Sequence, residues 1–299
     1  MITPKTLRKG DTVGLVATAR KISRDELQPA IEILESWGLK VELAPNLFKS
    51  HHQFAGTDEQ RLADLQGFID SIDIDAIICV RGGYGTVRII DELNFFPLIE
   101  KPKWICGYSD ITVLLNKLRK VGVECLHSTM PVNFTSNTPE SLESLRKALF
   151  GEELVISCAA HPLNRNGQAK GRVTGGNLSV LYSQTGSGTA IQPEGDILFI
   201  EDLDEYLYHI DRMMQNLKRN GYFEGIAGLI VGGMNAMNDN KIPFGQSAEE
   251  IIATVVRPYN FPVCFGFPAG HIDDNRSLIF GRRASLKVGD SVELVFENG

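Results

Sequence analysis

A serine stands at a bend of the chain where a nucleophile could be held. The apolar, strand-like segment 104–107 (WICG) leads to Ser109, and a helical pattern starts near Ile111. A strand-to-helix corner exposes a hydroxyl, and it places the amide of Asp110 at the positive end of a helix, where an oxyanion can be stabilised. The G-x-S-x-G pattern is incomplete, because Ile111 replaces the second glycine. Ser109 is therefore either a nucleophile or the cap of the following helix.

A glycine-rich loop follows another apolar strand. Residues 81–85 (RGGYG) contain three glycines, which let backbone N–H groups approach a ligand closely. The loop could supply an oxyanion-hole donor or hold a phosphate, but neither G-x-G-x-x-G nor G-x-x-x-x-G-K-[ST] is present, which disfavours a nucleotide. A tight turn would explain one or two of these glycines, and less readily all three.

A carboxylate and an imidazole follow strands in the second half of the chain. Residues 201–205 (EDLDE) resemble a solvated helix start, and a lone loop histidine such as His271 is more often structural or exposed. Together with Ser109, however, they permit a triad in which His271 takes the serine proton and Glu201 fixes the histidine tautomer. Such a triad would lie in a cleft between two domains, a favoured place for ligand pockets.

Other candidate sites are weaker. His51 and His52 have no carboxylate or cysteine at ligand spacing, so we expect no metal site. The turn at 175–177 (GGN) could present a helix N-terminus to a carboxylate, or it could be a simple turn. Without a nucleotide or metal motif, we expect no cofactor.

The first half of the chain alternates strands with helices, which predicts a mostly parallel sheet with right-handed crossovers. Capping boxes predict two of the helix starts, at Ser23 with Glu26 and at Thr57 with Gln60. Two further helices are expected near Ile111 and from Thr86 to Leu93. The expected strands cover residues 12–17, 41–44, 76–80, 104–107 and 124–127.

The length of 299 residues predicts two domains. Between residues 135 and 170 the pattern loosens into Asn, Ser, Thr, Pro and Gly, with one helix. We therefore expect an α/β domain over 1–135, a linker over 136–170 and a mixed α+β domain over 171–299 that carries Glu201 and His271. In this last part we expect strands at 196–200, 226–231 and 263–265, helices at 206–220 and 247–257, and antiparallel strands at 277–280, 284–288 and 291–296.

The composition excludes several classes of protein. Apolar residues at 43% and charged residues at 22% exclude disorder and collagen-like repeats. A formal net charge of −7 argues against a nucleic-acid-binding surface. No apolar run suits a signal peptide or a membrane span, so a soluble protein is expected. The five cysteines contain no C-x-x-C pair and resemble the reduced core thiols of a cytoplasmic protein.

Five segments together resemble the LD-carboxypeptidase family. They extend over nearly the whole chain, and five motifs in the family's order are far more specific than any one of them. The segments are RGGYG at 81–85, GYSDIT at 107–112, GGNLSVL at 175–181, IEDLDE with IDRMM at 200–214, and FGFPAGH with a following DN at 265–275.

The resemblance implies roles for residues and an architecture. Ser109 would be the nucleophile, Glu201 the orienting acid and His271 the base, with an oxyanion hole formed by the N–H groups of Gly83 and Asp110. The implied fold is a flavodoxin-like parallel-sheet N-terminal domain with a smaller, mixed α+β, swivelling C-terminal domain, usually in a homodimer.

The resemblance also implies a substrate. The family's main activity removes the terminal D-alanine from a murein tetrapeptide, after L-lysine or diaminopimelate, during cytoplasmic recycling of cell-wall peptides. The partner would be this small peptide, with no nucleic acid and no membrane. A carboxypeptidase must recognise a terminal carboxylate, for which Arg81, Gly176 and Asn177 are the candidates.

Two alternatives remain open at this stage. The family also includes self-immunity peptidases that cleave microcin C, a peptidyl nucleotide. The stretch between Gly186 and Asp196 is short and lacks tryptophan, which makes this branch the less expected one. The other alternative is a non-catalytic protein whose flavodoxin-like half holds a phosphate-bearing ligand, such as a flavin, through the loop at 81–85.

Overall fold

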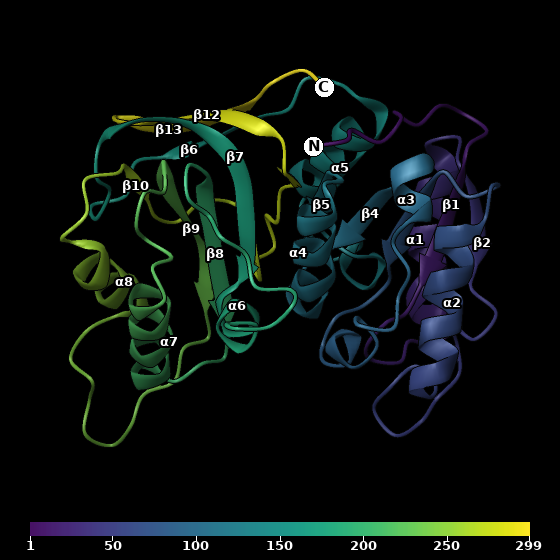
Figure 1. The fold of residues 1–299 in the computed structure, drawn as a ribbon, viewed down its shortest axis with the longest axis horizontal. Coiled ribbons are helices and arrows are strands. Elements are labelled where there is room, and N and C mark those ends of the chain that lie inside the picture. Colours follow the sequence, from purple (N-terminus) through teal and green to yellow (C-terminus); the bar gives the residue numbers. More distant parts are fainter.

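The computed structural model describes all 299 residues, and the chain forms two lobes that lie side by side (Figure 1). Each lobe is built around one sheet. The strands of the first sheet are β1 (Thr12–Val16), β2 (Lys40–Leu43), β3 (Ala76–Cys79), β4 (Trp104–Gly107), β5 (Cys125–His127) and β11 (Leu278–Phe280).

The parallel strands of the first sheet follow the order of a flavodoxin-like fold. β2, β1, β3, β4 and β5 are parallel neighbours in that order, which is the flavodoxin-like arrangement. β11 comes from the far end of the chain and pairs antiparallel with β5 at the edge. Since ligands bind at the carboxyl ends of such strands, the loops after β3 and β4 lie where a site is expected.

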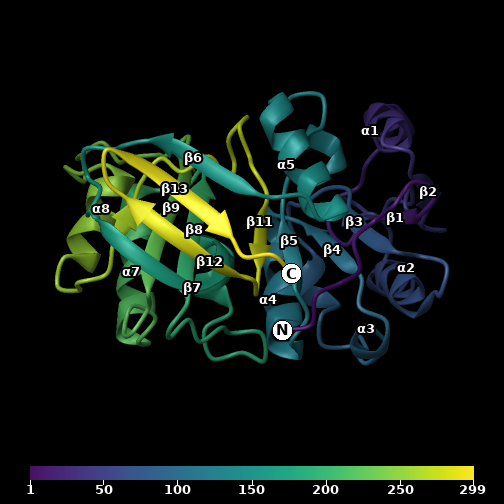
Figure 2. The same cartoon turned by 90° about the horizontal axis from the view of Figure 1, so that it is seen from above.

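Helices cover both faces of this sheet. Figure 2 shows α1 (Arg24–Ser36) and α5 (Pro139–Phe150) over one face, and α2 (Asp58–Asp70), α3 (Pro97–Glu100) and α4 (Thr112–Val121) over the other. The capping boxes predicted at Ser23 and Thr57 are both present, at the starts of α1 and α2. α4 lies beside the second lobe, next to its central strands (Figure 1).

The helix expected from Thr86 to Leu93 was wrong. Only a short 3-10 helix forms there, η1 (Thr86–Arg88), followed by turns. Four of its first five residues are β-branched, which disfavours a helix, and Gly85 before it offers no side chain for capping. The buried side chains of Ile89 and Ile90 hold this segment to the core instead.

The second sheet is half parallel and half antiparallel. Its order is β10-β9-β8-β7-β12-β13-β6, in which β10, β9, β8 and β7 are parallel and β12, β13 and β6 pair antiparallel. The alternating C-terminal pattern predicted β12 and β13 as antiparallel strands. These strands are β6 (Val155–Ala159), β7 (Gly167–Asn177), β8 (Ile197–Leu203), β9 (Gly228–Asn235), β10 (Val263–Cys264), β12 (Arg283–Val288) and β13 (Ser291–Phe296), and the lobe's helices are α6 (Leu178–Ser183), α7 (Leu207–Arg219) and α8 (Ala248–Val256).

The chain passes between the lobes more than once. Residues 136–170, expected as a linker, contain α5, which packs over the first sheet, and β6, which forms an edge of the second. Residues 278–280 return to the first sheet as β11. The two lobes are therefore joined by shared secondary structure as well as by connecting loops.

All five cysteines are free thiols, and all but Cys158 are buried. None of the helices has the length and the apolar character that crossing a membrane requires.

Candidate active site

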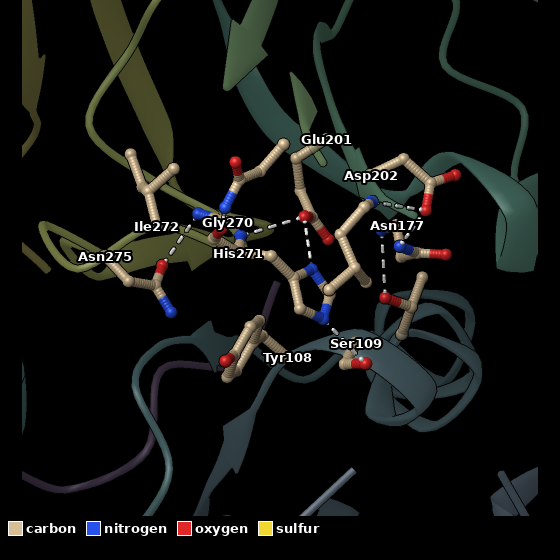
Figure 3. Close-up of polar contacts among 12 residues, drawn as sticks. Tyr108, Ser109, Asn177, Glu201, Asp202, Gly270, His271, Ile272 and Asn275 are labelled. Atoms are coloured by element: carbon tan, nitrogen blue, oxygen red, sulfur yellow. Dashed lines mark hydrogen bonds and ion pairs between the residues drawn. The ribbon is translucent and has the colours of Figure 1, made fainter. Parts of the chain in front are cut away.

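Three side chains from distant parts of the sequence meet between the two lobes (Figure 3). Nε2 of His271 lies 3.0 Å from Oγ of Ser109, and Nδ1 of His271 lies 2.7 Å from Oε2 of Glu201. With the Nδ1 proton donated to the carboxylate, Nε2 is left to accept the serine hydroxyl proton. The structure thus brings together the three residues predicted to form a triad, in the geometry that activates a hydroxyl.

Ser109 occupies a strained corner between β4 and α4. Its φ is +64°, a left-handed conformation that is uncommon for a residue other than glycine. The residue begins a short 3-10 helix, η2 (Ser109–Ile111), and its side chain caps neither η2 nor α4. The hydroxyl is therefore directed to His271 rather than to the backbone, as in a nucleophile elbow.

Strand alternation in β8 directs Glu201 toward the first lobe. Leu198 and Ile200 pack with the helices of the second lobe, whereas Ile197 and Phe199 belong to the core cluster shared with the first lobe. Side chains alternate along a strand with period two, so Glu201 lies on the same side of β8 as Ile197 and Phe199. It has no exposed surface.

The interpretation of residues 201–205 as a solvated helix start was wrong for its first two members. Pairing with β7 and β9 extends β8 to Leu203, so Glu201 and Asp202 lie within the sheet and are buried. α7 begins only at Leu207.

A tight loop places His271 on the carboxylate. Gly270 has a φ of +103°, and a Cβ there would lie 2.7 Å from Cβ of Glu201, so only glycine fits. The amide of Gly270 donates to Oδ1 of the buried Asn275 at 2.8 Å, and the amide of His271 donates to Oε2 of Glu201 at 3.1 Å. The ring of Tyr108 packs against the imidazole, with ring centroids 4.8 Å apart. Asn275 was part of the DN segment in the sequence, but no role was predicted for it.

The carboxylate and the imidazole stabilise each other's charged forms. Burial acts to raise the pKa of Glu201, but the charge and hydrogen bonds of His271 outweigh it, and the pKa of this carboxyl lies below its usual value. Burial acts to lower the pKa of His271, and Glu201 reverses this effect, so the pKa of the imidazole lies above its usual value. The pair is therefore arranged to stabilise an imidazolium formed during proton transfer.

The glycine-rich loop packs directly against Ser109. A Cβ on Gly82 would lie 3.0 Å from Cβ and 3.1 Å from Oγ of Ser109. The carboxylate of Asp110 accepts a hydrogen bond from the amide of Thr86 at 2.8 Å. This bond holds the end of the loop next to the bend that carries Ser109. Gly83, Ser109 and Asp110 line one pocket, so both residues predicted to donate amides adjoin the same pocket as the nucleophile.

A buried arginine holds the end of the loop at 81–85 through a hydrogen bond. The side chain of Arg61 in α2 is fully buried, and it donates to the carbonyl oxygens of Thr18 and Gly85 and to the carboxylate of Asp58. This role of Arg61 was not predicted from the sequence. The available indication was that Arg61 lies four residues before Leu65 on the apolar face of the helix.

A pocket of about 330 Å³ adjoins Ser109 and receives residues from both lobes. Its charged residues are Asp110, Asp202 and Glu205, and no lysine, arginine or histidine lines it. Burial raises the pKa of Asp202 to about 7, and the amide groups of Asn177 and Ser179 donate to its carboxylate. A larger pocket, of about 660 Å³, is lined mainly by residues 185–194 and 220–225 and contains none of the triad.

The residues expected to bind a terminal carboxylate have partners within the protein. Nη1 of Arg81 lies 3.1 Å from Oε1 of Glu26. The amide of Asn177 donates to the hydroxyl of Thr112 at 3.1 Å, and its side chain bonds to Asp202. A Cβ on Gly176 would lie 2.5 Å from the methyl group of Thr112. In this structure these groups join the two lobes and the loops around them.

Another histidine lies beneath the triad. The ring centroid of His127 is 5.8 Å from that of Tyr108 and 4.9 Å from that of Phe199. Both ring nitrogens are buried without a hydrogen-bond partner, and burial lowers the pKa of His127 to about 4. The imidazole is therefore neutral at pH 7. No group of three or more histidine, cysteine or carboxylate side chains is arranged to hold a metal ion.

Two family models match the chain. The model of the LD-carboxypeptidase N-terminal domain matches residues 13–128, and the model of the LD-carboxypeptidase C-terminal domain matches residues 170–286. With both halves matched in order, the chain belongs to the LD-carboxypeptidase family.

Individual relatives agree with this assignment. The chain is 34% identical over 300 residues to the "Probable murein peptide carboxypeptidase" of Bacillus subtilis, covering 98% of this chain and 93% of the relative. It is 26% identical to the microcin C7 self-immunity protein MccF of Escherichia coli, covering 94% and 91%. The crystal structure of muramoyltetrapeptide carboxypeptidase from Oxalobacter formigenes superposes with a TM-score of 0.87 at 26% identity, covering 95% of this chain and 98% of that chain.

Proposed function

We propose that the protein is a serine LD-carboxypeptidase that releases the terminal D-alanine from murein tetrapeptides in the recycling of cell-wall peptides. The observation that carries this proposal is the continuous hydrogen-bonded chain from Ser109 through His271 to the buried Glu201. The names of the relatives in Bacillus subtilis and Oxalobacter formigenes support the choice of substrate.

The proposed reaction is acyl transfer. Nε2 of His271 accepts the hydroxyl proton as Oγ of Ser109 attacks the scissile carbonyl carbon. The N–H groups of Gly83 and Asp110 hold the oxyanion of the tetrahedral intermediate, and loss of one such donor typically lowers turnover about 10²- to 10³-fold. D-alanine leaves with a proton from His271, and water then releases the peptide acid from Ser109 by the same route.

A peptidase that hydrolyses a microcin C-like peptidyl nucleotide is the second candidate, and the match to MccF supports it. The pocket beside Ser109 disfavours this candidate, because it carries carboxylates and no basic side chain to hold a phosphate. A non-catalytic flavin-binding role is disfavoured because the loop at 81–85 packs on Ser109 and Asp110, and the hydroxyl of Ser109 is hydrogen-bonded to His271.

The proposal is tested by incubating the purified protein with murein tetrapeptides carrying lysine or diaminopimelate at the third position, with and without a metal chelator. We expect release of free D-alanine and a tripeptide, unaffected by the chelator and abolished in Ser109→Ala. A competing peptidyl nucleotide should be the poorer substrate. Absence of D-alanine release from both tetrapeptides, or full activity of Ser109→Ala, would refute the proposal.

A further inference from the structure

A carboxypeptidase acts on the last residue of a peptide, so it needs a group that binds a free carboxylate one residue beyond the scissile carbonyl. Arginine suits this task, because its planar guanidinium can donate two parallel hydrogen bonds to a carboxylate. We propose that Arg20 binds the C-terminal carboxylate of the substrate, an inference that rests on the function proposed above.

Arg20 lies beside the loop at 81–85. Its amide donates to the carbonyl oxygen of Gly82 at 3.2 Å, and Gly82 itself packs on Ser109. Its side chain crosses Gly83, with Cδ, Cγ and Nε 2.5, 2.6 and 3.0 Å from the position that a Cβ on Gly83 would take. The guanidinium of Arg20 therefore lies beside Gly83, whose N–H is one of the two proposed oxyanion donors. A carboxylate one residue beyond the bound carbonyl is about 4 Å further along the peptide, within the reach of this side chain.

The basic side chains that neighbour Arg20 in sequence or in space have other partners. Arg81 forms an ion pair with Glu26, Lys21 bonds to a serine hydroxyl at 3.3 Å, and Arg24 lies 4.3 Å from the centroid of a phenylalanine ring. The side chain of Arg20 is exposed and takes part in none of the ion pairs or side-chain hydrogen bonds of the protein. Among these basic side chains beside the loop at 81–85, Arg20 is therefore the one that is free to bind a ligand.

The pocket of about 330 Å³ beside Ser109 has no basic side chain. Its charged groups are the carboxylates of Asp110, Asp202 and Glu205, and Arg20 is not among its lining residues. A terminal carboxylate in this pocket would meet acidic side chains and no basic partner. The acyl part of the peptide is therefore better accommodated there, with the terminal carboxylate directed toward Arg20.

The test compares a murein tetrapeptide ending in D-alanine with the same peptide ending in D-alaninamide. Hydrogen bonds to charged groups are among the strongest in proteins, so Arg20→Gln should lower kcat/KM for the free acid about 10- to 100-fold, mainly through KM. The amide lacks the charge, so its kcat/KM should stay the same. Arg20→Lys, which keeps a positive charge without the planar guanidinium, should recover part of the preference for the free acid over the amide. Arg24→Gln, which removes a neighbouring exposed arginine, should retain all of this preference.

The outcomes separate the two proposals. If the wild-type protein hydrolyses the free acid and Arg20→Gln keeps the same preference over the amide, the assignment of Arg20 is wrong and the enzyme assignment stands. An equal loss on both peptides also overturns the assignment, because Arg20 would then act on another part of the substrate or on the loop. If the wild type hydrolyses neither peptide, the proposed function fails and the role of Arg20 fails with it.

Discussion

Nδ1 of His271 and Oε2 of Glu201 lie 2.7 Å apart, and the amide of His271 donates to the same oxygen at 3.1 Å. One carboxylate oxygen therefore fixes both the backbone and the ring of the histidine. Glu201 has no exposed surface, so water does not compete for this oxygen. The relationship accounts for the tautomer of His271 and for the direction in which Nε2 faces Ser109.

Glu201→Gln should lower kcat about 10³- to 10⁴-fold while the protein stays folded. The amide nitrogen of glutamine can donate a hydrogen bond to Nδ1, which favours the tautomer whose Nε2 carries a proton and cannot accept one from Ser109. Steady-state kinetics with a D-alanine-terminated tetrapeptide would measure the loss, with circular dichroism as the folding control. A loss smaller than 10-fold would show that the carboxylate does not set the tautomer.

The pH dependence of kcat/KM should report the pKa of His271. The base must be neutral to accept a proton, so activity should rise as the pH rises through this pKa. Because Glu201 raises the pKa of His271 above 6.5, the midpoint of the acid limb should lie above pH 6.5. The residual activity of Glu201→Gln should show a lower midpoint. A wild-type midpoint below pH 6.5 would contradict the coupling between the two groups.

Gly82→Ala should impair catalysis with little effect on folding. The added Cβ would lie 3.0 Å from Cβ and 3.1 Å from Oγ of Ser109, so the hydroxyl must shift by a few tenths of an ångström. Small displacements of a reacting group are costly, and we expect a decrease of about 10-fold in kcat. Gly188→Ala is the matched control, since nothing lies closer than 4.0 Å to its added Cβ. Equal kcat values for the two variants would rule out the packing argument.

Gly270→Ala should destabilise the protein more than an alanine substitution at another glycine of positive φ. Gly221 also has a positive φ, of +76°, but nothing lies within 4 Å of a Cβ built there. Gly221→Ala should therefore cost only the left-handed conformation, about 1 to 2 kcal/mol. Gly270→Ala also collides with Glu201 and should cost about 1 to 3 kcal/mol more. Urea unfolding would measure both free energies, and similar values would disprove the close approach.

Local sequence patterns were sufficient for the elements that hold the site. Apolar runs and capping boxes located the five parallel strands and the starts of α1 and α2, since each depends on residues that are neighbours in sequence. The strand ends then indicated which loops would carry Ser109 and His271. Their meeting with Glu201 was expected from the family resemblance, because separations of 70 residues or more along the chain fix no geometry.

Features that depend on tertiary pairing could not be predicted. β8 includes Glu201 and Asp202 because β7 and β9 flank it, although the same acidic residues are typical of an exposed helix start. The ion pair of Arg81 and the path of Arg20 across Gly83 depend on how separate loops pack. Burial of Arg61 likewise requires carbonyl oxygens that lie 24 and 43 residues away in sequence.

The nucleophile is tested most directly by mass spectrometry of the protein after reaction with a fluorophosphonate, which forms a stable adduct with an activated serine. A single adduct is predicted, on the peptide that contains Ser109. It should be absent in Ser109→Ala and should form far more slowly in His271→Ala, where no base accepts the hydroxyl proton. An adduct on another residue, or equal labelling of the wild type and His271→Ala, would contradict the assignment of Ser109 as a serine activated by His271.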